Sequence, residues 1–198
     1  MNYLAHAYLS FSQPDIVVGN MISDFVKGRQ KLTYSTAIQK GITLHRMIDH
    51  FTDTHPVTHQ AKTYLKPAVG LYAGAFVDII YDHFLALDES LHTQQALQAL
   101  AEATYDVLEA YEAALPQKFA LMVPYMRLQN WLYNYRTIQG IENSFGGLVR
   151  RAVYLNNSVS AFDAFMKHYK ELEECYSLFF PDVKSFAQEQ LLLLSAES

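Results

Sequence analysis

The stretch GLYAGAFVDIIYDHFLAL, residues 70–87, decides the fold class of this chain. It is nearly long enough to cross a bilayer, but it contains Asp78, Asp82 and His83. Each charge at membrane depth costs about 2.5–3.5 kcal/mol on insertion scales. We therefore expect a buried helix in the core of a soluble protein, with no membrane contact.

Helical patterns extend outward from this stretch over the 198 residues. Few segments alternate apolar and polar residues for long, and the six prolines mostly separate periodic runs. The patterns predict helices at residues 3–11, 14–26, 36–51, 57–65, 68–87, 92–115, 117–135 with a kink near Pro124, 139–154, 160–179, and 182–194 after a Pro181-Asp182 cap. No repeat or linker is visible, so we predict one all-α domain, a helical bundle covering residues 1–198.

Composition and net charge argue against several classes of protein. Hydrophobic residues make up 51% of the chain, which allows a full core and argues against disorder. A net charge of −5 argues against nucleic-acid binding, because that requires a basic surface. Cys175 is the only cysteine, so no internal disulfide can form, and the N-terminus lacks the pattern of a signal peptide. We expect a cytoplasmic protein of undetermined oligomeric state.

Asp78 and Asp82 are ionisable residues at positions where the apolar pattern of residues 70–87 predicts a buried helix. They share one helix face, and their own helix offers no Lys or Arg to pair with them. Two like charges on one face repel each other unless a cation or a proton lies between them. A functional site is therefore favoured over a pair of salt bridges, and His83 adjoins it.

A second set of polar residues precedes this helix. His45 and Asp49 are four residues apart, a spacing that can present an imidazole and a carboxylate to one ion. Asp24 and His6 each lie among apolar residues. The alternatives are an ordinary helical pair for His45 and Asp49 and a satisfied core histidine for His6.

The residue types indicate the chemistry. Imidazole plus carboxylate without thiolate suits Mn²⁺, Fe²⁺, Zn²⁺, Co²⁺ or Mg²⁺. Such an ion can lower the pKa of bound water to roughly 7 and polarise a phosphoryl oxygen. The sequence therefore predicts a metal-dependent phosphohydrolase.

A basic cluster follows Asp24. It can be either a solvated helix end or a docking patch for an anionic partner in an otherwise acidic protein. Its members are Lys27, Arg29, Lys31, Lys40 and Arg46.

The same regions carry a family resemblance through five motifs in order: Asn2-Tyr3-Leu4-Ala5-His6; Gly19-Asn20 with Asp24-Phe25-Val26 and Gly28; His45-Arg46 with Asp49; Thr52-Asp53; and Asp82-His83-Phe84-Leu85. Together they resemble the acyl carrier protein phosphodiesterases, which are regarded as a divergent branch of the HD phosphatase/phosphodiesterase superfamily. The resemblance is dense through residue 87 and looser to the C-terminus.

This resemblance implies an HD-domain-like all-α fold and a divalent ion, usually Mn²⁺. The implied reaction hydrolyses the phosphodiester between phosphopantetheine and a serine of acyl carrier protein. Alternatives are an HD-like phosphohydrolase acting on a small phosphorylated metabolite or nucleotide, and a non-catalytic helical module that binds carrier protein or metal.

Combining motifs and resemblance gives a set of candidate residues. Metal ligands are expected among Asp24, His45, Asp49, Asp78, Asp82 and His83. His6, Asp24 and Arg46 are expected to be catalytic, with His6 a ligand or general acid/base and Arg46 a donor to the phosphate. The carrier protein is expected to contact Lys27, Arg29 and Lys31.

Overall fold

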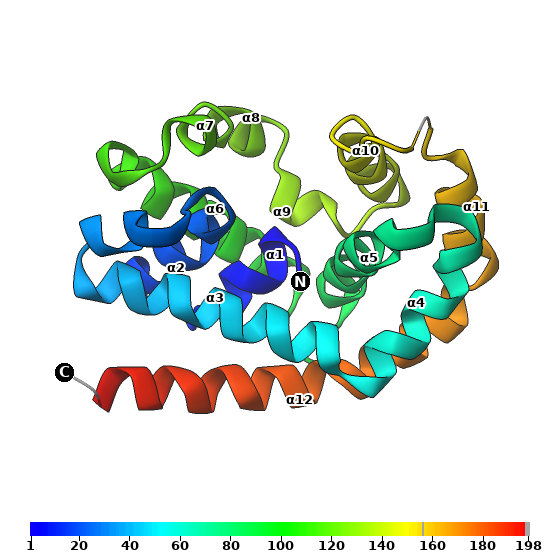
Figure 1. Cartoon of the computed structure of the whole chain (residues 1–198), viewed down its shortest axis with the longest axis horizontal. Coiled ribbons are helices and arrows are strands. Elements are labelled where there is room, and N and C mark those ends of the chain that lie inside the picture. Colours follow the sequence, from blue (N-terminus) through cyan, green and yellow to red (C-terminus); the bar gives the residue numbers. More distant parts are fainter. Residues whose placement is uncertain (156, 197–198) are drawn as a thin grey trace.

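The apolar stretch that decides the fold class forms the central helix of the protein. The computed structural model describes residues 1–155 and 157–196 and contains no strand among them, so the all-α prediction is confirmed. Helix α5 (Ala73–Leu87) buries Phe76, Ile80, Tyr81 and Phe84. It contacts α1 (Tyr3–Tyr8), α4 (Pro56–Val69), α10 (Ile138–Val149) and α12 (Tyr169–Ala196), as Figure 1 shows.

Helices α2 (Pro14–Ile22) and α3 (Thr36–Thr54) pack together through two glycines. A Cβ atom on Gly41 would lie 2.6 Å from the backbone oxygen of Ile16, and one on Gly19 would collide with the oxygen of Ile38. The backbones approach closely because neither glycine has a side chain. This contact fixes the position of His45, which lies about one turn after Gly41.

The remaining elements surround this framework. Helix α6 (Gln94–Ala110) lies against α1 and α2, and α11 (Val159–Lys167) connects α10 to α12 beside α4 (Figure 1). These elements are η1 (Ser23–Phe25), η2 (Gly28–Thr33), η3 (Gly70–Tyr72), α6 (Gln94–Ala110), η4 (Glu112–Ala114), α7 (Gln117–Ala120), α8 (Val123–Leu128), α9 (Trp131–Asn134) and α11 (Val159–Lys167).

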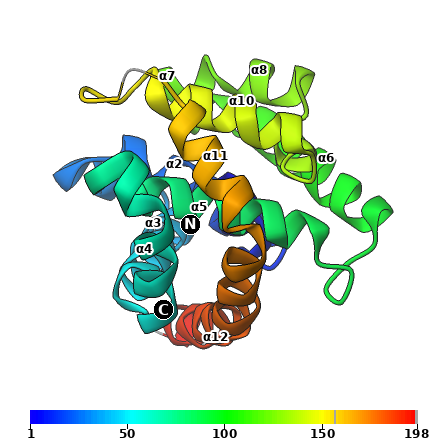
Figure 2. The ribbon, with the colours of Figure 1, turned by 90° about the vertical axis from the view of Figure 1, so that its right-hand side faces the viewer.

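Several predicted helix boundaries differ from the observed ones; for example, α4 continues through Pro67 to Val69, where the sequence predicts a break. Helix α12 continues through Pro181, although it changes direction between its brown and red parts in Figure 2. Burial of Phe179, Phe180 and Val183 on both sides of the proline offsets the lost backbone hydrogen bond. The segment 117–135, predicted as helical with a kink near Pro124, forms three short helices. The first break lies just before Pro124, and the left-handed backbone of Asn130 (φ 46°) makes the second, which was not predicted.

The continuous helical stretch Pro56–Leu87 is long and apolar enough to cross a membrane by length and composition. However, the 18-residue window that meets this criterion has a mean hydropathy of 1.2, and 61% of that window is buried inside the protein. This burial agrees with the expected core helix. The HD-like type and the domain limits 1–198 stay predictions.

Candidate metal centre

Three predicted site residues from two helices meet at one point. His6 comes from α1, and His45 and Asp49 come from one face of α3. His6 Nε2 lies 3.2 Å from Asp49 Oδ1, and His45 Nε2 lies 3.0 Å from Asp49 Oδ2. One potential ligand atom from each residue lies within 4.8 Å of the others, so this group could hold a metal ion.

Asn20, which is fully buried on α2, fixes both imidazoles. Its side-chain nitrogen donates to Ser10 Oγ at 2.9 Å, and the Ser10 hydroxyl donates to the backbone oxygen of His6 at 2.7 Å. The amide is thereby oriented with Oδ1 toward His6 Nδ1, at 3.0 Å. The backbone oxygen of the same Asn20 lies 2.7 Å from His45 Nδ1.

These contacts determine where the ring protons reside. Both partner atoms of the Nδ1 nitrogens are oxygen acceptors, so His6 and His45 each donate from Nδ1. In the neutral rings, the lone pairs are then on Nε2 and point toward Asp49. A metal ligand needs this arrangement, in which a second partner holds the other ring nitrogen.

His6 Nε2 is the atom of this group that a bound cation would best satisfy. It is buried and has no hydrogen-bond partner among the described residues. Burial, together with the neighbouring charge of His45, lowers the pKa of His6 to about 4, so the ring is neutral at pH 7. A bare nitrogen facing a carboxylate oxygen at 3.2 Å is unfavourable unless a cation joins them. The residues present therefore fit a divalent ion.

His45 carries a proton when no ion is bound. Burial alone would lower its pKa, but the contacts with Asp24 and Asp49 raise that pKa to about 9. Partial burial would raise the pKa of Asp49, yet the imidazoles of His45 and His6 hold it far below its usual value. The site thus concentrates negative charge, and the proton on His45 balances part of it.

Asp24 lies at the open side of this group. Its Oδ1 is 3.3 Å from His45 Nε2, and its side chain is 72% exposed. The contact with His45 holds the pKa of Asp24 below its usual value. The structure therefore brings Asp24 beside His6, His45 and Asp49, on the side that is open to solvent.

Asp78 contacts the same centre through an amino group. The amino nitrogen of Met1 lies 3.0 Å from Asp78 Oδ1 and 3.3 Å from Asp49 Oδ1. This contact supplies the positive charge that the sequence of α5 lacks.

The structure gives Asp82 and His83 partners outside the group formed by His6, His45 and Asp49. The fully buried Asp82 carboxylate accepts the backbone N–H groups of Leu4 at 2.7 Å and Ala5 at 3.2 Å, in the first turn of α1. His83 contacts the backbone oxygen of Tyr135 at 2.6 Å and the hydroxyl of Tyr169 at 2.9 Å. Their roles as metal ligands stay predictions.

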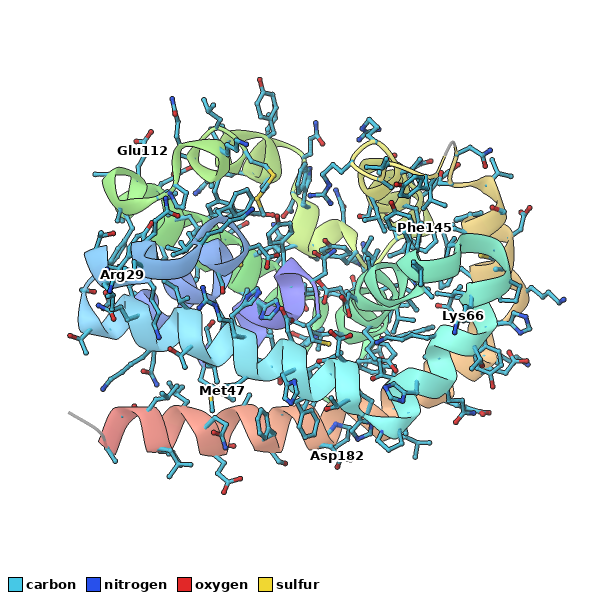
Figure 3. The ribbon with its side chains drawn as sticks, in the orientation of Figure 1. Arg29, Met47, Lys66, Glu112, Phe145 and Asp182 are labelled. Atoms are coloured by element: carbon cyan, nitrogen blue, oxygen red, sulfur yellow. The ribbon has the colours of Figure 1, made fainter. Side chains whose placement is uncertain are left out.

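The basic residues lie on and near η2. Lys27 and Arg29 are exposed, and Figure 3 marks Arg29 at one end of the molecule. Lys31 bonds to the hydroxyl of Thr43, and the nearby charge of Arg46 adds to burial in lowering the pKa of Lys31. Arg46 donates from Nη2 to the backbone oxygen of Val26 at 2.9 Å.

Sequence reasoning assigned no role to Asn20. The available signal was an amide inside the apolar run Ile16–Ile22, where it needs buried partners. Its partners, His6 and His45, lie 14 and 25 residues away along the chain.

Comparisons with known proteins identify the family of the chain. A family model described as acyl carrier protein phosphodiesterase matches residues 1–183. Curated proteins of that name from Photorhabdus laumondii subsp. laumondii and Yersinia enterocolitica are 30% and 29% identical over 191 residues. The alignments cover 96% of this chain in both cases, and 96% and 99% of the relatives. No solved structure matches. The chain belongs to the acyl carrier protein phosphodiesterase family.

Proposed function

We propose that this protein is a metal-dependent phosphodiesterase of the cytoplasm. It hydrolyses the phosphodiester that joins phosphopantetheine to a serine of acyl carrier protein, and it releases apo-carrier protein and phosphopantetheine. The substrate follows from the names of the relatives, which match this chain over nearly its whole length.

The buried Nε2 of His6, unpartnered among the described residues and directed at Asp49, carries the proposal of metal dependence. His6, His45 and Asp49 would hold the ion, which is Mn²⁺ in our proposal, with Asp24 as an additional ligand. When bound, a divalent ion supplies a Lewis acid for the phosphoryl oxygen and a water of lowered pKa.

Residues around that centre orient its side chains, accept a proton and bind the substrate. Asn20 orients both imidazoles, and the exposed Asp24 carboxylate is placed to accept a proton from water. Arg46 keeps donors beyond the one that contacts Val26, and these could bind the phosphate. The basic residues on and next to η2, which are Lys27, Arg29 and Lys31, would face the acidic carrier protein.

The test combines metal analysis with a product assay. Purified protein is stripped with a chelator, reloaded with Mn²⁺ and incubated with holo-carrier protein, and released phosphopantetheine is measured by mass. We expect release only from the reloaded protein, and none from His45→Ala. A matched control is His59→Ala, because His59 lies exposed on α4.

The alternatives give different results. Turnover of nucleotides without release of phosphopantetheine would favour a phosphohydrolase of small metabolites. Binding of holo-carrier protein or metal without any turnover would indicate a non-catalytic module. Full activity in the chelated protein would refute metal dependence.

A further inference from the structure

A cleft of about 880 Å³ is lined by residues from the start of α1 and from helices α9 and α10. Ligand sites for small molecules commonly have volumes of roughly 300–1,000 Å³. Its wall includes Tyr3, Trp131, Asn143, Arg150 and Arg151. None of these residues was assigned a function from the sequence.

The cleft adjoins the candidate metal centre. Asn2 and Ile79 line it, and they directly follow Met1, whose amino group contacts Asp49, and Asp78, which contacts that amino group. Tyr3 forms a second link: burial raises the pKa of its hydroxyl, and that hydroxyl is within electrostatic reach of both Arg151 and Asp24. A ligand in the cleft can therefore extend to the metal ligands.

The wall of the cleft combines two kinds of chemistry. Two adjacent arginines supply positive charge, and Arg150 lies over a glycine pair, because Cβ atoms on Gly146 and Gly147 would be 3.6 and 3.7 Å from its guanidinium nitrogens. The rest of the wall combines carboxamides with aromatic rings; among them are Gln129, Asn134, Asn143, Tyr3 and Trp131.

Phosphopantetheine has matching chemistry. It carries a phosphate at one end, followed by a geminal dimethyl group, a hydroxyl, two amides and a thiol. Arginine binds phosphate through paired N–H donors, carboxamides pair with amides, and aromatic faces cover methyl groups. A nucleotide base would also stack on an aromatic ring, but the two-amide arm makes fuller use of the carboxamides.

We propose that this cleft binds the phosphopantetheine arm of the substrate, with Arg151 at its phosphate end. This assignment rests on the proposed function, because the arm belongs to the carrier-protein substrate. The arm would enter past α9 and α10 and place its phosphate between Arg151 and the metal ligands.

Trp131 provides a direct readout, since it is the only tryptophan of the chain and lines the cleft. Titration of the wild-type protein with pantetheine and with phosphopantetheine should give a saturable change in tryptophan emission. Arg151→Ala should weaken binding of phosphopantetheine and leave that of pantetheine unchanged. An emission that responds to neither compound, or that responds to AMP alone, would overturn the assignment.

A cleft-filling variant extends the test to turnover. Gly147→Leu should weaken pantetheine binding and raise KM for holo-carrier protein by roughly 10- to 100-fold. Its turnover of bis(4-nitrophenyl) phosphate, which has no arm, should stay near the wild-type rate. The matched control is Gln188→Leu, an exposed position on α12, which should change neither substrate's kinetics.

The two proposals fail in different ways. A wild-type enzyme that releases phosphopantetheine, together with a folded Gly147→Leu variant of unchanged KM, would refute the cleft assignment alone. A metal-loaded wild-type enzyme that releases no phosphopantetheine would refute the proposed function, and the emission titration would still report on the cleft.

Discussion

His6 and His45 stack face to face, with ring centroids 3.8 Å apart and an angle of 13° between the planes. Both rings donate from Nδ1 to oxygens of one residue, Asn20. The two Nε2 atoms therefore point the same way, at the two oxygens of Asp49. One buried residue on α2 thus sets the direction of two potential ligands that come from different helices.

Replacement of Asn20 tests this role. Asn20→Leu removes the oxygen that holds His6 Nδ1, while the backbone oxygen beside His45 remains. We expect Mn²⁺ affinity to fall by about 10- to 100-fold, as is typical when a partner behind a metal-binding histidine is lost. Competition with a chromophoric chelator measures the change. Asn157→Leu, in an exposed loop, is the control, and an unchanged affinity in folded Asn20→Leu would disprove the role.

The proton on His45 predicts a pH dependence of stability in the metal-free protein. The pKa of His45 is about 9 in the folded state, against a usual value of 6.5. The folded state holds this proton more tightly than the unfolded chain does. The resulting stabilisation is therefore complete below pH 6.5 and is lost as the pH rises through 9, with a total on the order of 3 kcal/mol.

Urea unfolding of chelator-treated protein between pH 6 and 10 would measure this loss. His45→Gln should show a flatter profile over the same range, because it has no proton to lose. Equal profiles for the two proteins would mean that His45 does not carry the stabilising proton.

The contact between α2 and α3 predicts a strong effect of a single methyl group. In Gly41→Ala, the new Cβ would lie 2.6 Å from the oxygen of Ile16, so the two helices must separate. We expect a loss of about 1–3 kcal/mol in the free energy of unfolding, and weaker metal binding because His45 moves away from Asn20. Gly74→Ala is the control, since its Cβ would meet only the flexible end of Lys62. Equal stability of the two variants would contradict this view of the helix contact.

Much of the fold could be predicted because its signals are local. The apolar run at residues 70–87 indicates a buried helix by itself, and the spacing of His45 and Asp49 places both on one helix face. Pro181 misled the prediction because a helix packed on both sides can retain a proline. The local sequence pattern around Pro181 gives no information about that packing.

The partners of the site residues could not be predicted in the same way. The pattern indicates that Asp82 needs a partner, but its donors are backbone N–H groups of α1, 77 and 78 residues earlier in the chain. Every residue other than proline has such a group, so sequence cannot identify which one is used. The same holds for Asn20, whose partners become neighbours only after three helices have packed.

The basic residues of η2 predict a salt-dependent interaction with the carrier protein. Arg29 is exposed at one end of the molecule, whereas Lys66 lies on the opposite side of Figure 3. Arg29→Glu should raise KM for holo-carrier protein by about 3- to 10-fold at low salt, and the difference from wild type should shrink as ionic strength rises. Lys66→Glu makes the same charge change elsewhere and should have little effect. Equal KM values for these two variants would remove η2 from the docking surface.

Asp82 provides the sharpest distinction between a ligand and a positioning residue. Burial raises the pKa of its carboxyl to about 7, and its two oxygens accept the N–H groups that begin α1. In Asp82→Asn only one side-chain oxygen remains, so a buried N–H group loses its acceptor. We expect a loss of about 1–3 kcal/mol in stability, with Mn²⁺ affinity largely kept below the unfolding temperature.

His6→Ala is the matched comparison for Asp82→Asn, because His6 lies on the helix that Asp82 holds. It should lose most of the metal affinity with a smaller change in melting temperature, since it removes a ligand and leaves α1 anchored to α5. Thermal unfolding and metal titration of both variants separate the two roles. If Asp82→Asn lost its metal and kept its melting temperature, Asp82 would be a ligand, as the sequence predicts, and α1 would be held by other contacts.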